Sequence, residues 1–125
     1  MSQQACLIVD DSRMVRRVAA RIVRDLDFTS EEAENGQQAM EQCRIKMPDA
    51  ILLDWNMPVM DGLTFIKRLR SEAGGDKPTV IFCSAERDVN KIAEALDAGA
   101  DEYVMKPFDS DIIQSKFFQA GLVSE

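Results

Sequence analysis

Acidic side chains stand where two apolar runs of the sequence end. Asp54 follows the run 51–53, and the pair Asp10 and Asp11 follows the run 5–9. A carboxylate at the end of a buried strand must be paired, hydrogen-bonded or bound to a cation, because burying an isolated charge is costly. Taken alone, Asp54 is either a functional carboxylate or a residue that caps a turn.

Two further predicted strands also end in a polar group. Ser84 follows the apolar run 79–83, and Lys106 follows the short strand 101–105. Each has a plain structural alternative, a turn serine and a lysine whose stem packs while its head reaches water. The carboxyl ends of parallel strands meet at one edge of a sheet, where ligands bind. We therefore expect all four positions to converge on a single site.

Three carboxylates, a hydroxyl and an ammonium group in one place favour phosphoryl chemistry. The acids repel one another unless a cation joins them, and ligation by oxygen alone suits Mg²⁺. A lysine and a serine hydroxyl can bind phosphoryl oxygens, and a carboxylate can attack phosphorus to form an acyl phosphate. The chain contains no histidine, which excludes histidine acid–base catalysis, histidine metal ligands and a phosphohistidine on this chain.

Strand and helix patterns alternate five times along the chain. Strands are expected at 5–9, 28–34, 51–53, 79–83 and 101–105, and helices at about 13–26, 35–47, 62–72, 88–98 and from 109 or 110 onward. This alternation predicts an α/β fold with a doubly wound parallel sheet and right-handed crossovers. The segment 28–34 is much more polar than the other strands, as is typical of an edge strand.

The helices carry apolar residues at helical spacing, which predicts their buried faces. For the first helix these are Met14, Val15, Val18, Ile22 and Leu26, and for the fourth they are Val89, Ile92, Ala93 and Leu96. The other face of the first helix carries Arg13, Arg17, Arg21 and Arg24, either as a solvated surface or as a docking surface for an acidic partner. Phe117 and Phe118 point about 100° apart on the last helix, so one of them is expected to be exposed.

Composition narrows the class of protein. The length of 125 residues fits one domain, and a formal charge of −7 disfavours binding to nucleic acid. Cys6, Cys43 and Cys83 are widely spaced within apolar segments, which indicates buried free thiols rather than disulfides or a zinc site. No signal peptide or long apolar span is recognisable, so we expect a cytoplasmic protein that does not associate with membranes.

Several motifs together resemble the receiver domain of bacterial two-component response regulators, most closely the stand-alone chemotaxis type. They are Ile8-Val9-Asp10-Asp11-Ser12, Leu53-Asp54-Trp55-Asn56-Met57-Pro58, Met60-Asp61-Gly62, Ser84-Ala85 and the segment 99–108. The resemblance spans essentially the whole chain. It implies a flavodoxin-like (βα)5 sandwich with strand order 2-1-3-4-5, and a single receiver domain over residues 1–125 without an effector domain.

The resemblance also implies roles for individual residues. Asp54 would accept a phosphoryl group from a phosphohistidine, and Mg²⁺, for which Mn²⁺ can substitute, would be held by Asp11, Asp54 and the backbone carbonyl of Asn56. Asp10 would contribute through water. The phosphoryl group would be bound and sensed at Ser84, Ala85, Lys106 and Tyr103, with a cis peptide between Lys106 and Pro107. Asn56 and Glu86 would flank the path of the hydrolytic water.

Two surfaces follow from the same resemblance. The output face of the fourth helix, fifth strand and fifth helix would include Lys91, Ala95, Tyr103 and Lys116, and the phosphodonor would dock near Arg13, Arg17 and Arg21. The implied function is a phosphorylation-activated signalling switch that receives its phosphoryl group from a histidine kinase or histidine phosphotransfer protein. The switch would act by contact with a downstream protein, and we expect a monomer before phosphorylation.

Other functional classes are compatible with parts of this pattern. The resemblance implies not a conventional enzyme but a protein that catalyses its own phosphoryl transfer from phosphohistidine and its own dephosphorylation. One alternative is a phosphorelay intermediate or phosphate sink with no dedicated output partner. A phosphatase of the haloacid-dehalogenase type is disfavoured, because Asn56 stands where that family requires a second aspartate.

Overall fold

A computed structural model describes residues 3–85 and 87–124, and it contains five strands alternating with five helices in that range. The strands are β1 (Ala5–Val9), β2 (Thr29–Ala33), β3 (Ala50–Leu53), β4 (Thr79–Ser84) and β5 (Glu102–Met105). The helices are α1 (Arg13–Asp25), α2 (Gly36–Ile45), α3 (Gly62–Ser71), α4 (Val89–Asp97) and α5 (Ser110–Gln119). The predicted alternation is confirmed.

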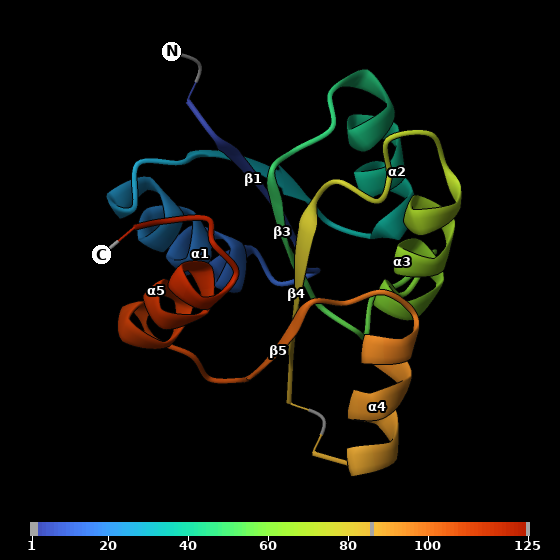
Figure 1. The fold of residues 1–125 in the computed structure, drawn as a ribbon. Coiled ribbons are helices and arrows are strands. Elements are labelled where there is room, and N and C mark those ends of the chain that lie inside the picture. The colour runs from blue at the N-terminus through green and yellow to red at the C-terminus, as the bar shows by residue number, and fades with distance from the viewer. Residues whose placement is uncertain (1–2, 86, 125) are drawn as a thin grey trace.

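The five strands form one parallel sheet in the order β2-β1-β3-β4-β5. Helices α1 and α5 cover one face of the sheet, and α2, α3 and α4 cover the other (Figure 1). The predicted flavodoxin-like topology is therefore confirmed. In this order β1 and β3 are neighbours, with Val9 opposite Leu53, so the residues that follow these two strands emerge side by side.

The continuous apolar runs form the inner strands because both of their faces are covered. Every residue of β1 and β3 is buried, as expected of parallel strands between two helical layers. The three cysteines are buried and free, as predicted. Burial raises the pKa of the Cys43 thiol to about 11 and that of Cys83 to about 12, so these thiols remain protonated at neutral pH.

Strand β2 lies at the edge of the sheet, as its polar sequence predicts. Glutamine side chains of α2 cover part of its open edge. The Gln42 amide donates to the carbonyl of Glu32 at 2.7 Å, and the backbone N–H of Glu34 donates to the Gln38 side chain at 2.9 Å. An edge covered in this way offers fewer free backbone groups for pairing with another strand.

The inner face of α1 differs from the predicted one. Met14 is 76% exposed and Val18 is 49% exposed, so the prediction that they are buried is wrong. The buried residues of α1 are Arg16, Ala19, Ala20, Ile22 and Val23. The helix therefore turns its alanines toward the sheet, and these small side chains let it lie close to the apolar side chains of β1.

The inner face of α4 was also predicted incorrectly. Of its described residues only Ala95 is buried, whereas Val89 is 76% exposed and Leu96 is 43% exposed. A small residue at the point of contact again brings the helix close to the sheet. Because Ala95 is fully buried, its assignment to an exposed output face is wrong as well.

Helix α5 confirms that one of the adjacent phenylalanines is exposed. Phe117 is fully buried and packs edge-on against Phe28, with ring centroids 5.1 Å apart, whereas Phe118 is 47% exposed. Asp109 caps the helix by accepting a hydrogen bond from the backbone N–H of Ile112. Within the described residues no helix is both long enough and apolar enough to cross a lipid bilayer.

Candidate functional site

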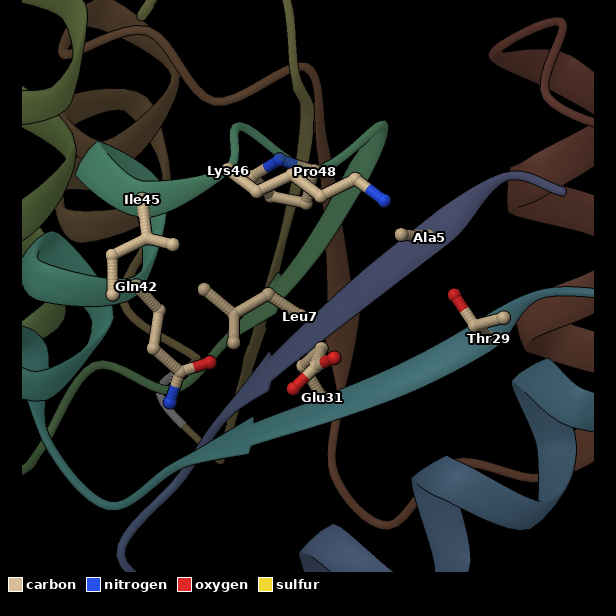
Figure 2. Close-up of a pocket in the computed structure, with 8 residues that line it drawn as sticks. All are labelled: Ala5, Leu7, Thr29, Glu31, Gln42, Ile45, Lys46 and Pro48. Atoms are coloured by element: carbon tan, nitrogen blue, oxygen red, sulfur yellow. The ribbon is translucent and has the colours of Figure 1, made fainter. Parts of the chain in front are cut away.

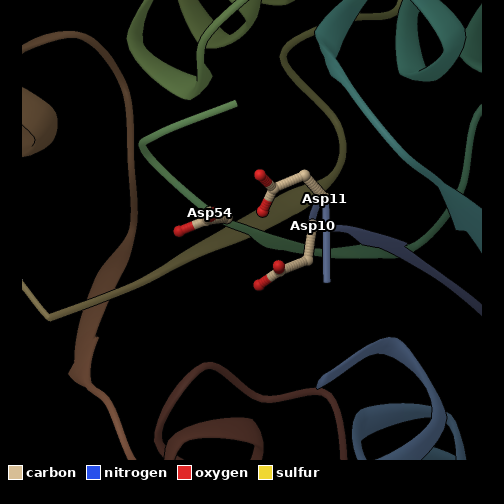
Figure 3. A group of neighbouring side chains, drawn as sticks. All are labelled: Asp10, Asp11 and Asp54. Atoms are coloured by element: carbon tan, nitrogen blue, oxygen red, sulfur yellow. The ribbon is translucent and has the colours of Figure 1, made fainter. Parts of the chain in front are cut away.

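Three carboxylates meet at the carboxyl ends of β1 and β3. Asp10, Asp11 and Asp54 each place a carboxylate oxygen within 4.8 Å of the others (Figure 3). Their proximity follows from topology, because β1 and β3 are adjacent and parallel. The predicted convergence of these three residues is therefore present in the structure.

Asp10 is fixed by hydrogen bonds at both its backbone and its carboxylate. Its backbone N–H donates to the carbonyl of Ala33 at 3.1 Å. Its Oδ1 accepts from the N–H of Ser12 at 2.9 Å, and its Oδ2 accepts from Nζ of Lys106 at 2.7 Å. Asp10 is only 3% exposed, so this buried carboxylate has the hydrogen bonds that its burial requires.

Lys106 brings the positive charge of the site. Its Nζ lies 2.7 Å from Asp10 Oδ2 and 3.2 Å from Asp54 Oδ1. Partial burial acts to lower the pKa of Lys106, but the hydrogen bond to Asp10 and the charges of both carboxylates outweigh it and raise the pKa. The ammonium group is thus held in its charged form. The peptide bond between Lys106 and Pro107 is cis, as the resemblance implied.

Asp54 is 7% exposed and lies in an environment that disfavours its charge. Burial and the neighbouring carboxylate of Asp10 raise its pKa, and the attraction of Lys106 offsets this only in part. A second positive charge beside Asp54 would therefore be favourable.

The residues present fit a hard divalent cation. Three carboxylates face one ammonium group, and all of the converging side-chain ligands are oxygens, the donor set that Mg²⁺ prefers. Asp11 is exposed and Asp10 and Asp54 are buried, so the cluster has a solvent-facing side on which waters and a ligand can complete the coordination. Receiver domains in general bind Mg²⁺ at an acidic pocket of this kind.

Gly62 allows the first turn of α3 to approach the backbone of Asp54. A Cβ atom at position 62 would overlap the carbonyl oxygen of Asp54. The Gly62 N–H donates to the carbonyl of Trp55 at 2.9 Å, and Asp61 caps the helix by accepting from the N–H of Thr64. The motif Met60-Asp61-Gly62 was noticed in the sequence, but this close approach was not inferred from it.

An aromatic chain leads from the site toward β5. The ring of Trp55 lies 5.2 Å from that of Phe82, which is stacked on Tyr103 with centroids 6.2 Å apart. Lys91 on α4 places its Nζ 5.8 Å from the centroid of the Trp55 ring. Tyr103 is partly buried. It therefore lies between the protein interior and the surface that was predicted to be the output face.

The other predicted residues take various positions. Ser84 is 1% exposed at the end of β4, opposite Met105, and Ala85 is exposed. Asn56 is exposed just beyond Asp54, and Glu86 lies outside the described residues.

Lys116 forms an ion pair with Glu102 at 2.8 Å. Arg13, Arg17 and Arg21 are exposed on α1, as predicted.

An apolar groove next to the site was missed by the sequence analysis. It has a volume of about 410 Å³ and is lined by Met14, Val15, Val18, Ala85, Lys106, Pro107 and Phe108. Met14 and Val18 are the α1 residues that were expected to be buried. Lys106 lines this groove and also contacts Asp54 through its Nζ, so this side chain connects the groove to the carboxylate cluster.

A second groove lies at the opposite end of the strands. It has a volume of about 300 Å³ and is formed by the first residues of β1 and β2 and the end of α2 (Figure 2). Its lining residues are Ala5, Leu7, Thr29, Glu31, Gln42, Ile45, Lys46 and Pro48. None of them belongs to the carboxylate cluster, so this groove is separate from the candidate site.

Comparison with known proteins gives one consistent result. The family model described as the response regulator receiver domain matches residues 6–118. The chemotaxis protein CheY of Pseudomonas aeruginosa is 35% identical over 111 residues, covering 88% of this chain and 90% of that protein. CheY-3 of Vibrio cholerae is 34% identical over 111 residues, covering 88% of this chain and 85% of that protein.

Solved structures agree with the sequence comparison. Chemotaxis protein CheY4 of Vibrio cholerae superimposes with a TM-score of 0.89 at 26% identity, covering 94% of this chain and 98% of the other. A putative response regulator from Chloroflexus aurantiacus gives a TM-score of 0.88 at 26% identity, covering 94% and 97% of the two chains.

Proposed function

This chain belongs to the response regulator receiver domain family as a CheY-like signalling domain, and we propose that it is a switch activated by phosphorylation of Asp54. The observation that carries the proposal is the position of Lys106, whose Nζ lies within hydrogen-bonding distance of both Asp10 and Asp54. An ammonium group beside a buried carboxylate with a raised pKa suits a site that gains negative charge when it works.

The proposed reaction transfers a phosphoryl group from a phosphohistidine of a histidine kinase or phosphotransfer protein. A carboxylate oxygen of Asp54 forms the new bond to phosphorus while the bond between phosphorus and the imidazole nitrogen breaks. The imidazole keeps the electron pair of that bond and takes a proton from solvent. Lys106 and the hydroxyl of Ser84 donate to the phosphoryl oxygens, so the protein contributes mainly positioning and charge stabilisation.

The cation site completes this arrangement. By resemblance to the family, Asp11, Asp54 and the backbone carbonyl of Asn56 would hold Mg²⁺ or Mn²⁺, with Asp10 contributing through water. The bound cation supplies positive charge that offsets repulsion between the carboxylates and the incoming phosphoryl oxygens. Asp10 and Lys106 keep the remaining charges in place through their 2.7 Å contact.

Phosphorylation would change the surface through a redistribution of charge. The phosphoryl group adds about −1.5 to −2 charges, and each charge-assisted hydrogen bond to it contributes roughly 1.5–3 kcal/mol. Lys106 and Ser84 would shift toward it, and the aromatic chain from Trp55 to Tyr103 leads to the output face. That face comprises Lys91, Tyr103 and Lys116, without the buried Ala95.

The phosphodonor is proposed to dock in the groove beside Lys106. Met14 and Val18 supply exposed apolar surface there, and the same helix carries the exposed Arg13 and Arg17. A protein seated in this groove would present its phosphohistidine to Asp54, because Lys106 borders both places. The arginines would favour a donor whose surface is acidic around that histidine.

Stopped-flow fluorescence of Trp55 tests the proposal. Trp55 is the single tryptophan and follows Asp54 directly. Acetyl phosphate, a small phosphodonor, should change the emission only when Mg²⁺ is present, and Asp54→Asn should abolish the acetyl phosphate step. Met14→Ser combined with Val18→Ser should leave this reaction unchanged but slow transfer from a phosphorylated histidine phosphotransfer protein. An unchanged rate from the protein donor would argue against the groove as the docking surface.

A further inference from the structure

Arg16 is a buried arginine that holds the backbone of the acidic site. Although it lies on α1 among exposed arginines, it faces the sheet and is 8% exposed. Its Nη1 donates to the backbone carbonyl of Asp10 at 2.8 Å. Its Nε donates to Oε1 of Glu32 on β2 at 3.0 Å, and its Nη2 lies 3.9 Å from Oε1 of Glu34.

A buried guanidinium is difficult to explain by packing alone. Removing a charge from water is costly, and an apolar side chain of similar volume often stabilises a protein equally well or better. The four neighbouring arginines of α1, at positions 13, 17, 21 and 24, remain exposed. Arg16 is therefore buried and at the same time makes a specific hydrogen bond to the backbone carbonyl of Asp10.

The carbonyl that Arg16 binds belongs to the peptide between Asp10 and Asp11. On the other side of that peptide, the N–H of Ser12 donates to Oδ1 of Asp10 at 2.9 Å. These two contacts fix the turn that follows β1, and the orientation of this turn determines the direction of the exposed Asp11 side chain. Fixing the peptide thus holds both carboxylates toward Asp54.

We propose that Arg16 is a positioning residue for the cation site formed by Asp10, Asp11 and Asp54. Its bond to the Asp10 carbonyl presets the Asp10–Asp11 turn before a cation arrives. The assignment of the cation to this cluster rests on the proposed function, whereas the fixing of the turn is a property of the chain without a cation.

The two glutamates that pair with Arg16, Glu32 on β2 and Glu34 just after this strand, have a separate part in this arrangement. Glu32 and Glu34 offset the charge of the guanidinium, so Arg16 can remain buried near the cluster with little added positive field at the cation site. The geometry of the hydrogen bond, rather than the charge, then accounts for the effect. The two contributions can be separated by substitution: Glu32→Gln weakens the ion pair but leaves the bond to Asp10.

The experiment compares Arg16→Met with Val23→Ala, which removes buried volume from the same helix without touching the turn. In the cation-free protein, amide hydrogen exchange of Ser12 should accelerate in Arg16→Met beyond what its change in global stability explains, and Val23→Ala should show no such excess. Fluorescence titration of Trp55 with Mg²⁺ should give about tenfold weaker binding in Arg16→Met, a loss typical of residues that orient metal ligands. Glu32→Gln should bind Mg²⁺ nearly as the wild type does.

Arg16→Lys provides a second test, and the one to use if Arg16→Met does not fold. Lysine keeps the charge but lacks the guanidinium fork that reaches both Asp10 and Glu32, so it should also weaken Mg²⁺ binding. Equal exchange at Ser12 and equal Mg²⁺ affinity in the Arg16 variants and Val23→Ala would overturn the positioning role. A wild-type chain that binds Mg²⁺ but is never phosphorylated would instead refute the proposed function and leave the role of Arg16 intact.

Discussion

The ammonium group of Lys106 lies 3.2 Å from Oδ1 of Asp54, although 52 positions separate the two residues in the chain. The contact joins the carboxyl end of β3 to the loop after β5, across the intervening strand β4. It brings a positive charge to a carboxylate whose ionised form is otherwise disfavoured by burial and by Asp10. Lys106 therefore offsets only part of the negative charge of the carboxylates. A further cation, or a change at Asp54, would alter the net charge of the site.

The first prediction concerns stability without divalent cations. The pKa of Asp54 is raised in the fold by burial and by Asp10. A carboxyl group with a raised pKa stabilises the fold most below its unfolded pKa, and this contribution is lost as the pH rises through the folded pKa. Asp54→Asn should therefore increase the free energy of unfolding at neutral pH and gain little at acidic pH.

Urea denaturation in the presence of a chelator at pH 4 and pH 7.5 measures this effect. Asp97→Asn removes an exposed carboxylate from α4 and serves as the control. Addition of Mg²⁺ should narrow the difference by stabilising the wild type, because a ligand that binds only the folded state raises its stability. A stability gain from Asp54→Asn that does not depend on pH would contradict the electrostatic explanation.

The second prediction concerns Gly62. A methyl group at this position overlaps the carbonyl of Asp54, so Gly62→Ala must displace either the start of α3 or the backbone at the end of β3. Overpacking of this kind typically costs about 1–3 kcal/mol. We expect that loss in urea denaturation together with slower phosphorylation by acetyl phosphate.

Gly74→Ala is the matched control for this variant. Gly74 has open space around it but a φ of +78°, which an alanine adopts at a cost of roughly 1 kcal/mol. It should lower stability while leaving the phosphorylation rate unchanged. If Gly62→Ala behaved like Gly74→Ala, the close approach of α3 would not be important for the site.

The third prediction concerns Val59, which has a φ of +70° in the loop between β3 and α3 and is 82% exposed. This conformation is rare for a β-branched residue and well tolerated by asparagine. Val59→Asn should therefore stabilise the protein by about 1 kcal/mol. Val59→Ala keeps the Cβ without the branch and should gain less. Equal unfolding midpoints for the three proteins would show that the loop carries no strain.

The strands and the site could be predicted from sequence because their signals are local. Apolar runs that end in Asp10, Asp54 and Ser84, together with the short strand that ends at Lys106, predicted both the parallel sheet and the shared edge. The sequence also predicted the polar edge strand and the exposure of one of Phe117 and Phe118. These features depend on strand periodicity, turn residues and the rule that parallel strands end on the same side.

The buried faces of α1 and α4 could not be predicted in the same way. Helical spacing favoured Met14 and Val18, but the sheet instead receives Ala19, Ala20 and Val23. Both stripes are apolar, and the choice between them depends on how closely the helix can approach the sheet. The burial of Arg16 was not predicted for a related reason. An arginine is expected at the surface, and its partner Glu32 lies on another element, β2, so the spacing of residues within the helix does not indicate the contact.

The most direct test of the proposed switch is the intact mass of the protein after incubation with acetyl phosphate. The wild type should gain one phosphoryl group when Mg²⁺ is present and none when a chelator removes it. Asp54→Asn should gain none under either condition, although its fold should be at least as stable. A wild type that stays unmodified, or an equal adduct on Asp54→Asn, would contradict the assignment of Asp54 as the phosphoryl acceptor.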